Sequence, residues 1–176
     1  QLAPNDTTWA TAPARFYVLA GTGPLTLDNT TPPAPGAGAR IRSVNGISRV
    51  NCVVAGTSGL VAPDQAGILE LNAANTYSGD TVIYRGKIQV GNVDALPHGS
   101  RTGNIILYTG GNPGNNPILD VRDVDITING LSSNTNNFGN GTLPQVTSLS
   151  ANAGTSTLTI GDNNASATYD GTIDDG

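Results

Sequence analysis

Residues 67–82 read GILELNAANTYSGDTV, from Gly67 to Val82. Leu69 and Leu71 alternate with other residues at the period of a half-buried strand. Asn75 and the Gly79 that follows four residues later are typical of a turn, because Asn and Gly accept backbone conformations that other residues avoid. Val82 then begins a second apolar run. The stretch therefore predicts two short strands joined by a corner.

The same stretch resembles the autotransporter-associated β-strand repeat, also called the passenger-associated transport repeat. That repeat has the pattern G-x-L-x-L-x-x-x-N-T-Y-x-G-x-T-x-V, followed by x-x-G-x-L-x-V-G. Residues 84–92 fit the second part, with Ile88 at its Leu position, and residues 94–100 resemble the turn that often comes next. The likeness extends over about 43–176, and Asn75-Thr76-Tyr77-Ser78-Gly79 is its most specific part.

The resemblance implies a right-handed parallel β-helix on the outside of a bacterium, in which the motif residues are structural. Apolar residues would stack inward, glycines would permit positive φ at corners, Asn75 would bond to adjacent rungs from a turn, and Tyr77 would cover a corner of the core. Val82, Ile88 and Val90 are among the residues expected to face inward. The expected structural motif comprises Leu69, Leu71, Asn75, Thr76, Tyr77, Gly79, Gly86, Gly91, Tyr169 and Gly171.

Short alternating runs recur along the rest of the chain, separated by Gly, Asn, Asp or Pro, and no stretch has the 3.6-residue spacing of an amphipathic helix. An all-β solenoid domain is therefore expected over 25–176, with about 20–25 residues per rung, about six or seven rungs and a length of roughly 30 Å. Residues 1–24, rich in Pro and aromatic residues, are expected to form an arm or a cap. The predicted strands are 15–19, 25–27, 39–44, 49–54, 68–71, 80–84, 87–90, 104–108, 118–121, 125–128, 145–150, 157–160 and 167–173.

Composition excludes several classes of function. Charged residues make up 12% of the chain, with 8 basic and 13 acidic residues and a net charge of −5, so no basic patch for nucleic acid is expected. A single Cys and a single His rule out an internal disulfide framework and a Cys/His zinc cluster, and neither a metal nor a cofactor is expected. No segment approaches the roughly 18 apolar residues of a membrane-spanning helix. Cys52 lies in an apolar run and is expected to be a buried, inert thiol. His98 follows Pro97 in an expected turn, has no partner motif in the sequence, and is expected to be a surface residue.

The best candidate for chemistry is a group of charged residues at 120–125. In a strand, Asp120 and Arg122 share one face, whereas Asp123 breaks the alternation and indicates a corner close to Asp125. The favoured interpretation is a solvated, partly ion-paired turn. The alternative is a carboxylate cleft of a polysaccharide-cleaving enzyme, a function that parallel β-helices also carry. The polar residues of 162–164 and 170–175 are expected to cap turns, with calcium ligation as the alternative.

The resemblance and the composition together favour a non-enzymatic extracellular module on the surface of a bacterium or secreted from it. Such a module would serve as a surface scaffold or as a self-associating filament subunit, and it could bind a glycan or a protein on a cell surface. Its solenoid ends are unpaired strand edges, so other copies of itself or further repeats of the same protein are the expected partners.

Overall fold

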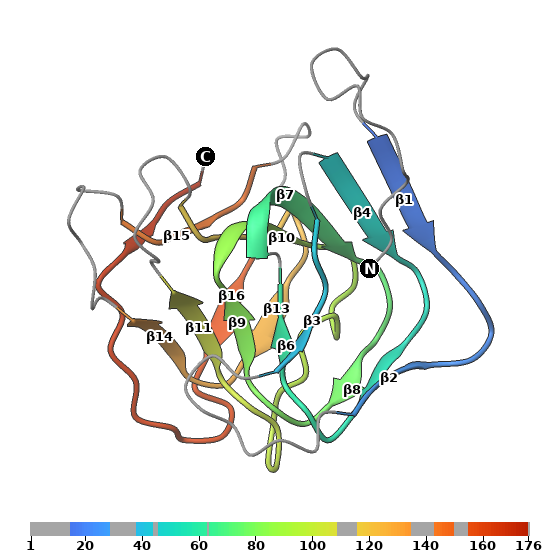
Figure 1. Cartoon of the computed structure of the whole chain (residues 1–176). Coiled ribbons are helices and arrows are strands. Elements are labelled where there is room, and N and C mark those ends of the chain that lie inside the picture. Colours follow the sequence, from blue (N-terminus) through green and yellow to red (C-terminus); the bar gives the residue numbers. More distant parts are fainter. Residues whose placement is uncertain are drawn as a thin grey trace.

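The computed structural model describes residues 15–28, 38–43, 46–62, 64–108, 116–134, 143–149 and 155–175. This part of the chain is all-β, and each pair of neighbouring strands runs parallel (Figure 1). The first sheet contains, in order, β1 (Arg15–Leu19), β4 (Gly46–Val50), β7 (Asp64–Leu71), β10 (Arg85–Val90), β12 (Ile118–Asp120), β15 (Gln145–Thr147) and β17 (Thr172–Ile173). The second sheet contains β14 (Leu131–Asn134), β11 (Ile105–Tyr108), β9 (Thr81–Ile83), β6 (Leu60–Val61) and β3 (Ala39–Arg40). The third sheet contains β2 (Leu25–Leu27), β5 (Val54–Gly56) and β8 (Thr76–Tyr77). The fourth sheet contains β13 (Ile126–Ile128) and β16 (Leu158–Ile160).

The chain visits these sheets in a repeating order. It passes from the first sheet to the third and then the second, as β1–β2–β3, and repeats this circuit as β4–β5–β6 and β7–β8–β9. Residues 91–104 then connect β10 to β11, and β13 and β16 follow strands of the first sheet in the later circuits. Each strand pairs with its counterpart one circuit away, so the all-β, parallel architecture is consistent with a β-helix.

The register of the first sheet gives the length of each circuit. Val50 pairs with Leu71 and Leu71 pairs with Val90, so these circuits contain 71 − 50 = 21 and 90 − 71 = 19 residues. Leu119 pairs with Val146, which gives 146 − 119 = 27 residues. The estimate of about 20–25 residues per rung is therefore too short for later circuits. The seven strands of the sheet, at about 4.8 Å each, span roughly 29 Å, close to the expected length.

One predicted strand is wrong because the chain turns within it. The prediction ran through 49–54, but β4 ends at Val50 and β5 begins at Val54. Between them, the Asn51 amide donates to the Leu19 carbonyl one circuit earlier, and Cys52 is buried as a free thiol with 6% exposure. An apolar residue on the inside of a corner is indistinguishable, in sequence, from one inside a strand. Similarly, only the last two residues of the predicted strand 167–173 are in β17.

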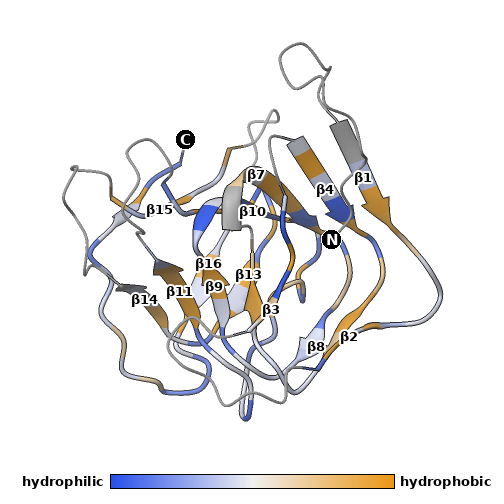
Figure 2. Ribbon diagram, in the orientation of Figure 1, coloured by the Kyte–Doolittle hydropathy of each residue, from blue (hydrophilic) through white to orange (hydrophobic). Residues whose placement is uncertain are grey.

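One apolar core runs along the inside of the circuits, where Figure 2 shows hydrophobic residues on neighbouring strands. Leu69, Leu71, Ile88 and Val90 are completely buried, and Val82 is 3% exposed. Within the described residues, no helix is long and apolar enough to span a membrane. The predicted arm or cap falls mostly on 1–14, outside the described residues, whereas β1 pairs directly with β4 in the first sheet.

The glycines of the motif serve two different purposes. Gly86 adopts a φ of 71°, the left-handed conformation expected at a corner. Gly79 and Gly91 do not adopt positive φ, so the expectation for them is wrong. Close approach explains Gly79 instead, because a Cβ there would lie 2.2 Å from the backbone nitrogen of Gly59. A Cβ on Gly91 would meet Oδ1 of Asn72, the end of a side chain that can move aside.

We therefore predict that Gly79→Ala destabilises the protein by about 1–3 kcal/mol, because backbone of the neighbouring circuit occupies the space that the methyl group needs. Gly23→Ala is the matched control, since nothing lies within 4 Å of its Cβ position. Urea unfolding followed by circular dichroism measures both variants. Equal midpoints for the two variants would contradict the close-approach role of Gly79.

Candidate functional site

Asn75, the central residue of the motif, joins three successive circuits. Its side chain is 6% exposed, its Oδ1 accepts a hydrogen bond of 2.8 Å from the Val54 amide, and its Nδ2 donates one of 2.7 Å to the Ala95 carbonyl. Its own amide donates to the Asp94 carbonyl at 2.9 Å. These contacts satisfy backbone groups that would otherwise be buried without partners at this corner.

The two residues after Asn75 divide between surface and core. Thr76 is exposed and pairs in register with Ala55, whereas Tyr77 is completely buried. The Tyr77 hydroxyl lies 2.6 Å from Thr81 Oγ1, and burial raises the pKa of the Tyr77 phenol well above its usual value. The phenol therefore stays neutral and closes a corner of the core.

Tyr169 and Gly171, which repeat the spacing of Tyr77 and Gly79, build a different corner. The half-buried Tyr169 hydroxyl donates toward the carbonyls of Pro144 and Thr172, each at 3.0 Å. Burial and, secondarily, the negative charge of Asp174 raise the pKa of Tyr169 to about 12. A Cβ on Gly171 would collide with the Pro144 carbonyl and with the Tyr169 phenol, so the glycine makes room for both.

A row of polar side chains crosses the outer face of the first sheet, where each residue alternates with core residues of its strand. Glu70, which is only 5% exposed, pairs with the guanidinium of Arg49 on the preceding strand. Its second oxygen lies 3.5 Å from Arg122 Nη1. The row contains, in register, Arg49, Glu70, Gln89, Asp120 and Thr147.

Asp120, the centre of the candidate catalytic group, has a fully buried carboxylate. Its Oδ2 accepts hydrogen bonds from Gln89 Nε2 at 2.9 Å and Lys87 Nζ at 3.3 Å. Its Oδ1 accepts from the backbone amides of Leu149 at 3.0 Å and Arg122 at 3.3 Å. Four donors occupy this carboxylate, so it fixes the loop after β15 onto the sheet and presents no lone pair to a substrate.

The other two acidic residues of the group also contact neighbouring segments of the chain. The Asp123 amide donates to Ser148 Oγ at 3.3 Å, and Asp125 Oδ1 accepts from the Thr157 amide at 2.7 Å. Arg122 and Asp123 have φ values of 46° and 60°, which confirms a corner here. No group of three or more His, Cys, Asp or Glu side chains within the described residues is arranged to hold a metal. The contacts of Asp120 and Arg122 therefore favour the interpretation as an ion-paired turn.

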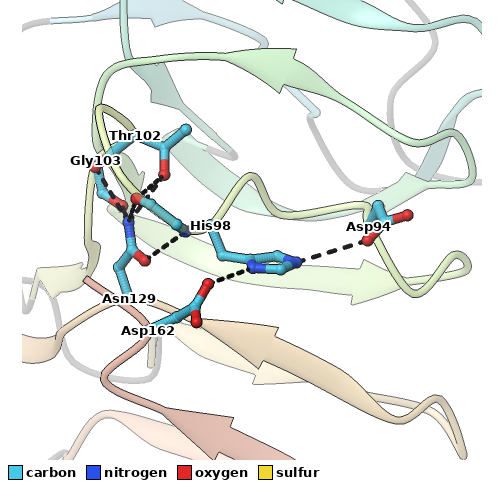
Figure 3. Close-up of polar contacts among 7 residues, drawn as sticks. Asp94, His98, Thr102, Gly103, Asn129 and Asp162 are labelled. Atoms are coloured by element: carbon cyan, nitrogen blue, oxygen red, sulfur yellow. Dashed lines mark hydrogen bonds and ion pairs between the residues drawn. The ribbon is translucent and has the colours of Figure 1, made fainter. Parts of the chain in front are cut away.

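His98 is partly exposed, in agreement with the expected surface position, and it has two carboxylate partners. Its Nδ1 lies 2.8 Å from Asp162 Oδ2 and its Nε2 lies 3.5 Å from Asp94 Oδ1, on opposite sides of the ring (Figure 3). Asp162 lies 64 residues after His98, so the sequence gives no sign of that contact. Only the contact between His98 and Asp94, which are four residues apart, could have been expected from their spacing. These three side chains join the loop 91–104 to the turn after β16.

Asn129 anchors the same loop from beneath and was missed in the sequence. This residue is 1% exposed, its Oδ1 accepts from the Gly99 amide at 2.8 Å, and its Nδ2 lies within 3.1 Å of acceptors on Gly99, Thr102 and Gly103 (Figure 3). A buried Asn with every polar atom bonded fixes the loop. Neighbouring Asn163 Oδ1 caps the Ala165 amide at 3.0 Å, which is the turn-capping role expected for residues 162–164.

We predict that Asp120→Asn lowers the free energy of unfolding by about 3–5 kcal/mol, because the amide cannot pair with the half-buried Lys87 ammonium. Asp125→Asn is the control, since its Oδ1 still accepts the Thr157 amide at the surface, and it should change stability by less than about 1 kcal/mol. Guanidinium unfolding measures both. A change below that limit in Asp120→Asn would show that the carboxylate does not hold the loop.

Comparison with known proteins finds a relative among bacterial surface proteins. The chain is 34% identical over 111 residues to the adhesin BmaC autotransporter of Brucella suis biovar 1 (strain 1330). The aligned region covers 63% of this chain and 3% of that adhesin, so the chain spans a small part of its length. No family model and no solved structure matches the chain. This comparison shows a likeness to a part of an autotransporter adhesin.

Proposed function

We propose that this chain is a non-enzymatic, adhesin-type module on a bacterial surface, built as a right-handed parallel β-helix. The observation that carries the proposal is the similarity to the autotransporter adhesin, over the same residues that contain the strand–corner motif. The repeating order of parallel strands supports it, because a stiff stack of circuits holds a binding surface away from the cell.

The use of the charged residues supports a scaffold rather than an enzyme. Asp120 and Glu70 are nearly or fully buried and bonded within the protein, and His98 lies between two carboxylates. A general acid or base must reach a proton on the substrate. In this chain, these groups instead connect circuits to one another.

Display of residues 1–176 on a non-adherent bacterium, through an unrelated anchor, tests the proposal. We expect several-fold more bacteria to attach to cultured host cells than with the anchor alone, and soluble chain to compete with this attachment. Attachment equal to that of the anchor alone, with the segment folded on the surface, would contradict the proposal. Release of reducing ends from polygalacturonate by the purified chain, lost in Asp120→Asn, would favour the enzyme instead.

We further propose that β17 pairs with another copy of the repeat, either in a second molecule or in further repeats of the same protein. Ile173 on this edge strand is 60% exposed and Ile160 on β16 is 46% exposed. An exposed apolar strand edge favours pairing with another strand. The residues after Arg122 include six acidic and no basic side chains, whereas residues 1–50 carry four basic and two acidic ones, so opposite ends attract.

Head-to-tail pairing predicts that the apparent mass of the purified chain rises with concentration in sedimentation equilibrium. Ile173→Lys should abolish this rise, because a charge on the edge strand opposes pairing. A monodisperse monomer at millimolar concentration would contradict pairing between molecules.

A further inference from the structure

Two tyrosines and an arginine form a cluster where the second sheet leads into the first. Tyr84 directly follows β9, Arg85 begins β10, and Tyr108 ends the neighbouring strand β11. Because Ile83 and Leu107 are register partners, the tyrosines that follow them lie side by side. Their rings stack with centroids 4.8 Å apart and planes 13° apart, and Arg85 Cζ lies 5.5 Å from the Tyr84 centroid. We call these three residues the tyrosine–arginine corner.

Arg85 differs from the ion-paired cations of the first sheet. Arg49 and Arg122 contact Glu70, and Lys87 contacts Asp120. Within the described residues, the Arg85 Nε is buried and has no hydrogen-bond acceptor, and the contact found for its guanidinium is the face of Tyr84. A buried N–H without an acceptor is unfavourable and is rarely left so in a native protein. This cation therefore has unused capacity for an acceptor.

Rotation of the Arg85 side chain toward solvent would make that capacity available to a ligand. No hydrogen bond holds Nε in its present position, and the cation–π contact with Tyr84 would be exchanged for contacts with the ligand. The guanidinium edge has the geometry that pairs with two oxygens of a carboxylate or sulfate group. Tyr84, Arg85 and Tyr108 are all partly exposed, so a ligand can reach them from solvent.

The charge of the surrounding circuits permits an anionic ligand despite the net charge of −5. Residues 40–90 carry five basic side chains against three acidic ones, of which Asp64 is the register partner of Arg85 on β7, and the acidic excess of the chain lies after Arg122. An anion approaching the tyrosine–arginine corner therefore meets the less acidic part of the molecule.

We propose that the tyrosine–arginine corner binds an oxyanion group of a saccharide, with the Arg85 guanidinium pairing with the anion and the tyrosine rings and hydroxyls contacting the sugar. The shared ligand chemistry is a planar or tetrahedral oxyanion on a sugar ring, supplied by a uronate or by a sulfated sugar. This inference rests on the proposed adhesin-type function, because it names the ligand class of a surface module.

The test titrates the purified chain with polygalacturonate, heparin and neutral dextran. We expect binding to polygalacturonate, heparin or both, and none to dextran, and which of the first two binds distinguishes carboxylate from sulfate. Arg85→Gln should weaken binding by about tenfold or more, and Arg85→Lys should weaken it less because an ammonium keeps the charge but not the fork. Tyr108→Ala should also weaken binding. Arg101→Gln, which removes the same charge from an exposed residue of the loop 91–104, should leave it unchanged.

Several outcomes would overturn the inference: equal losses in Arg85→Gln and Arg101→Gln, undiminished binding in Arg85→Gln, or equal binding of dextran. Unfolding midpoints equal to that of the wild type show that the variants are folded.

Displayed chain that attaches to cells while the purified chain binds no polysaccharide also overturns the inference, and leaves the proposed function standing. If that attachment is lost in Arg85→Gln, the partner is an acidic protein instead. Arg85-dependent polysaccharide binding without attachment to cells supports the inference and contradicts the adhesin function.

Discussion

Hydrogen bonds between successive circuits hold this chain together, and every corner must bring two backbones close enough to make them. One circuit buries too little apolar surface to be stable alone, so its strands depend on neighbours about 4.8 Å away. Corners break the regular pairing, and there Asn75 supplies the missing partners to Val54 and Ala95. Gly79 meets the same constraint by having no side chain where the next backbone passes.

That constraint explains the disposition of the polar residues. Asp120 holds the loop after β15 against the first sheet, and Asn129 fixes the loop after β10. His98, in that second loop, contacts Asp162 in the turn after β16, two circuits later in the chain. Groups that could perform chemistry in another protein are bonded within this one. Arg85 is the contrasting case, since its buried Nε lacks an acceptor in the described part of the chain.

Features encoded by neighbouring residues could be predicted from the sequence, and features that depend on distant ones could not. The alternation of Leu69 and Leu71 and the Asn75–Gly79 corner gave an all-β chain of short strands, because strand period and turn chemistry are local. The contact of His98 with Asp162 and the crowding around Gly79 arise between circuits, so their partners follow only from the register. The break between β4 and β5 was missed because Cys52 and Val53 are as apolar as strand residues.

Gly79 and Gly91 were given the wrong role for the same reason, because their neighbours lie in another circuit. Positive φ is a property of one residue, and a glycine in the sequence suggests it directly. Close approach is a property of two segments about 20 residues apart, and it follows only from the register. The register partners Val50 and Leu71 are 21 residues apart. Circuits that contain a longer loop have a different length, so a fixed sequence spacing does not identify their register partners.

Native-state hydrogen exchange at the amide of Val54 tests whether bonds between circuits hold the fold. This amide bonds to a side chain of the next circuit and not to the backbone of a neighbouring strand. If bonds between circuits hold the fold, Val54 exchanges as slowly as Ile88 in the core, and far more slowly than Val93 in an exposed turn. Exchange of Val54 at the rate of Val93 would contradict the account.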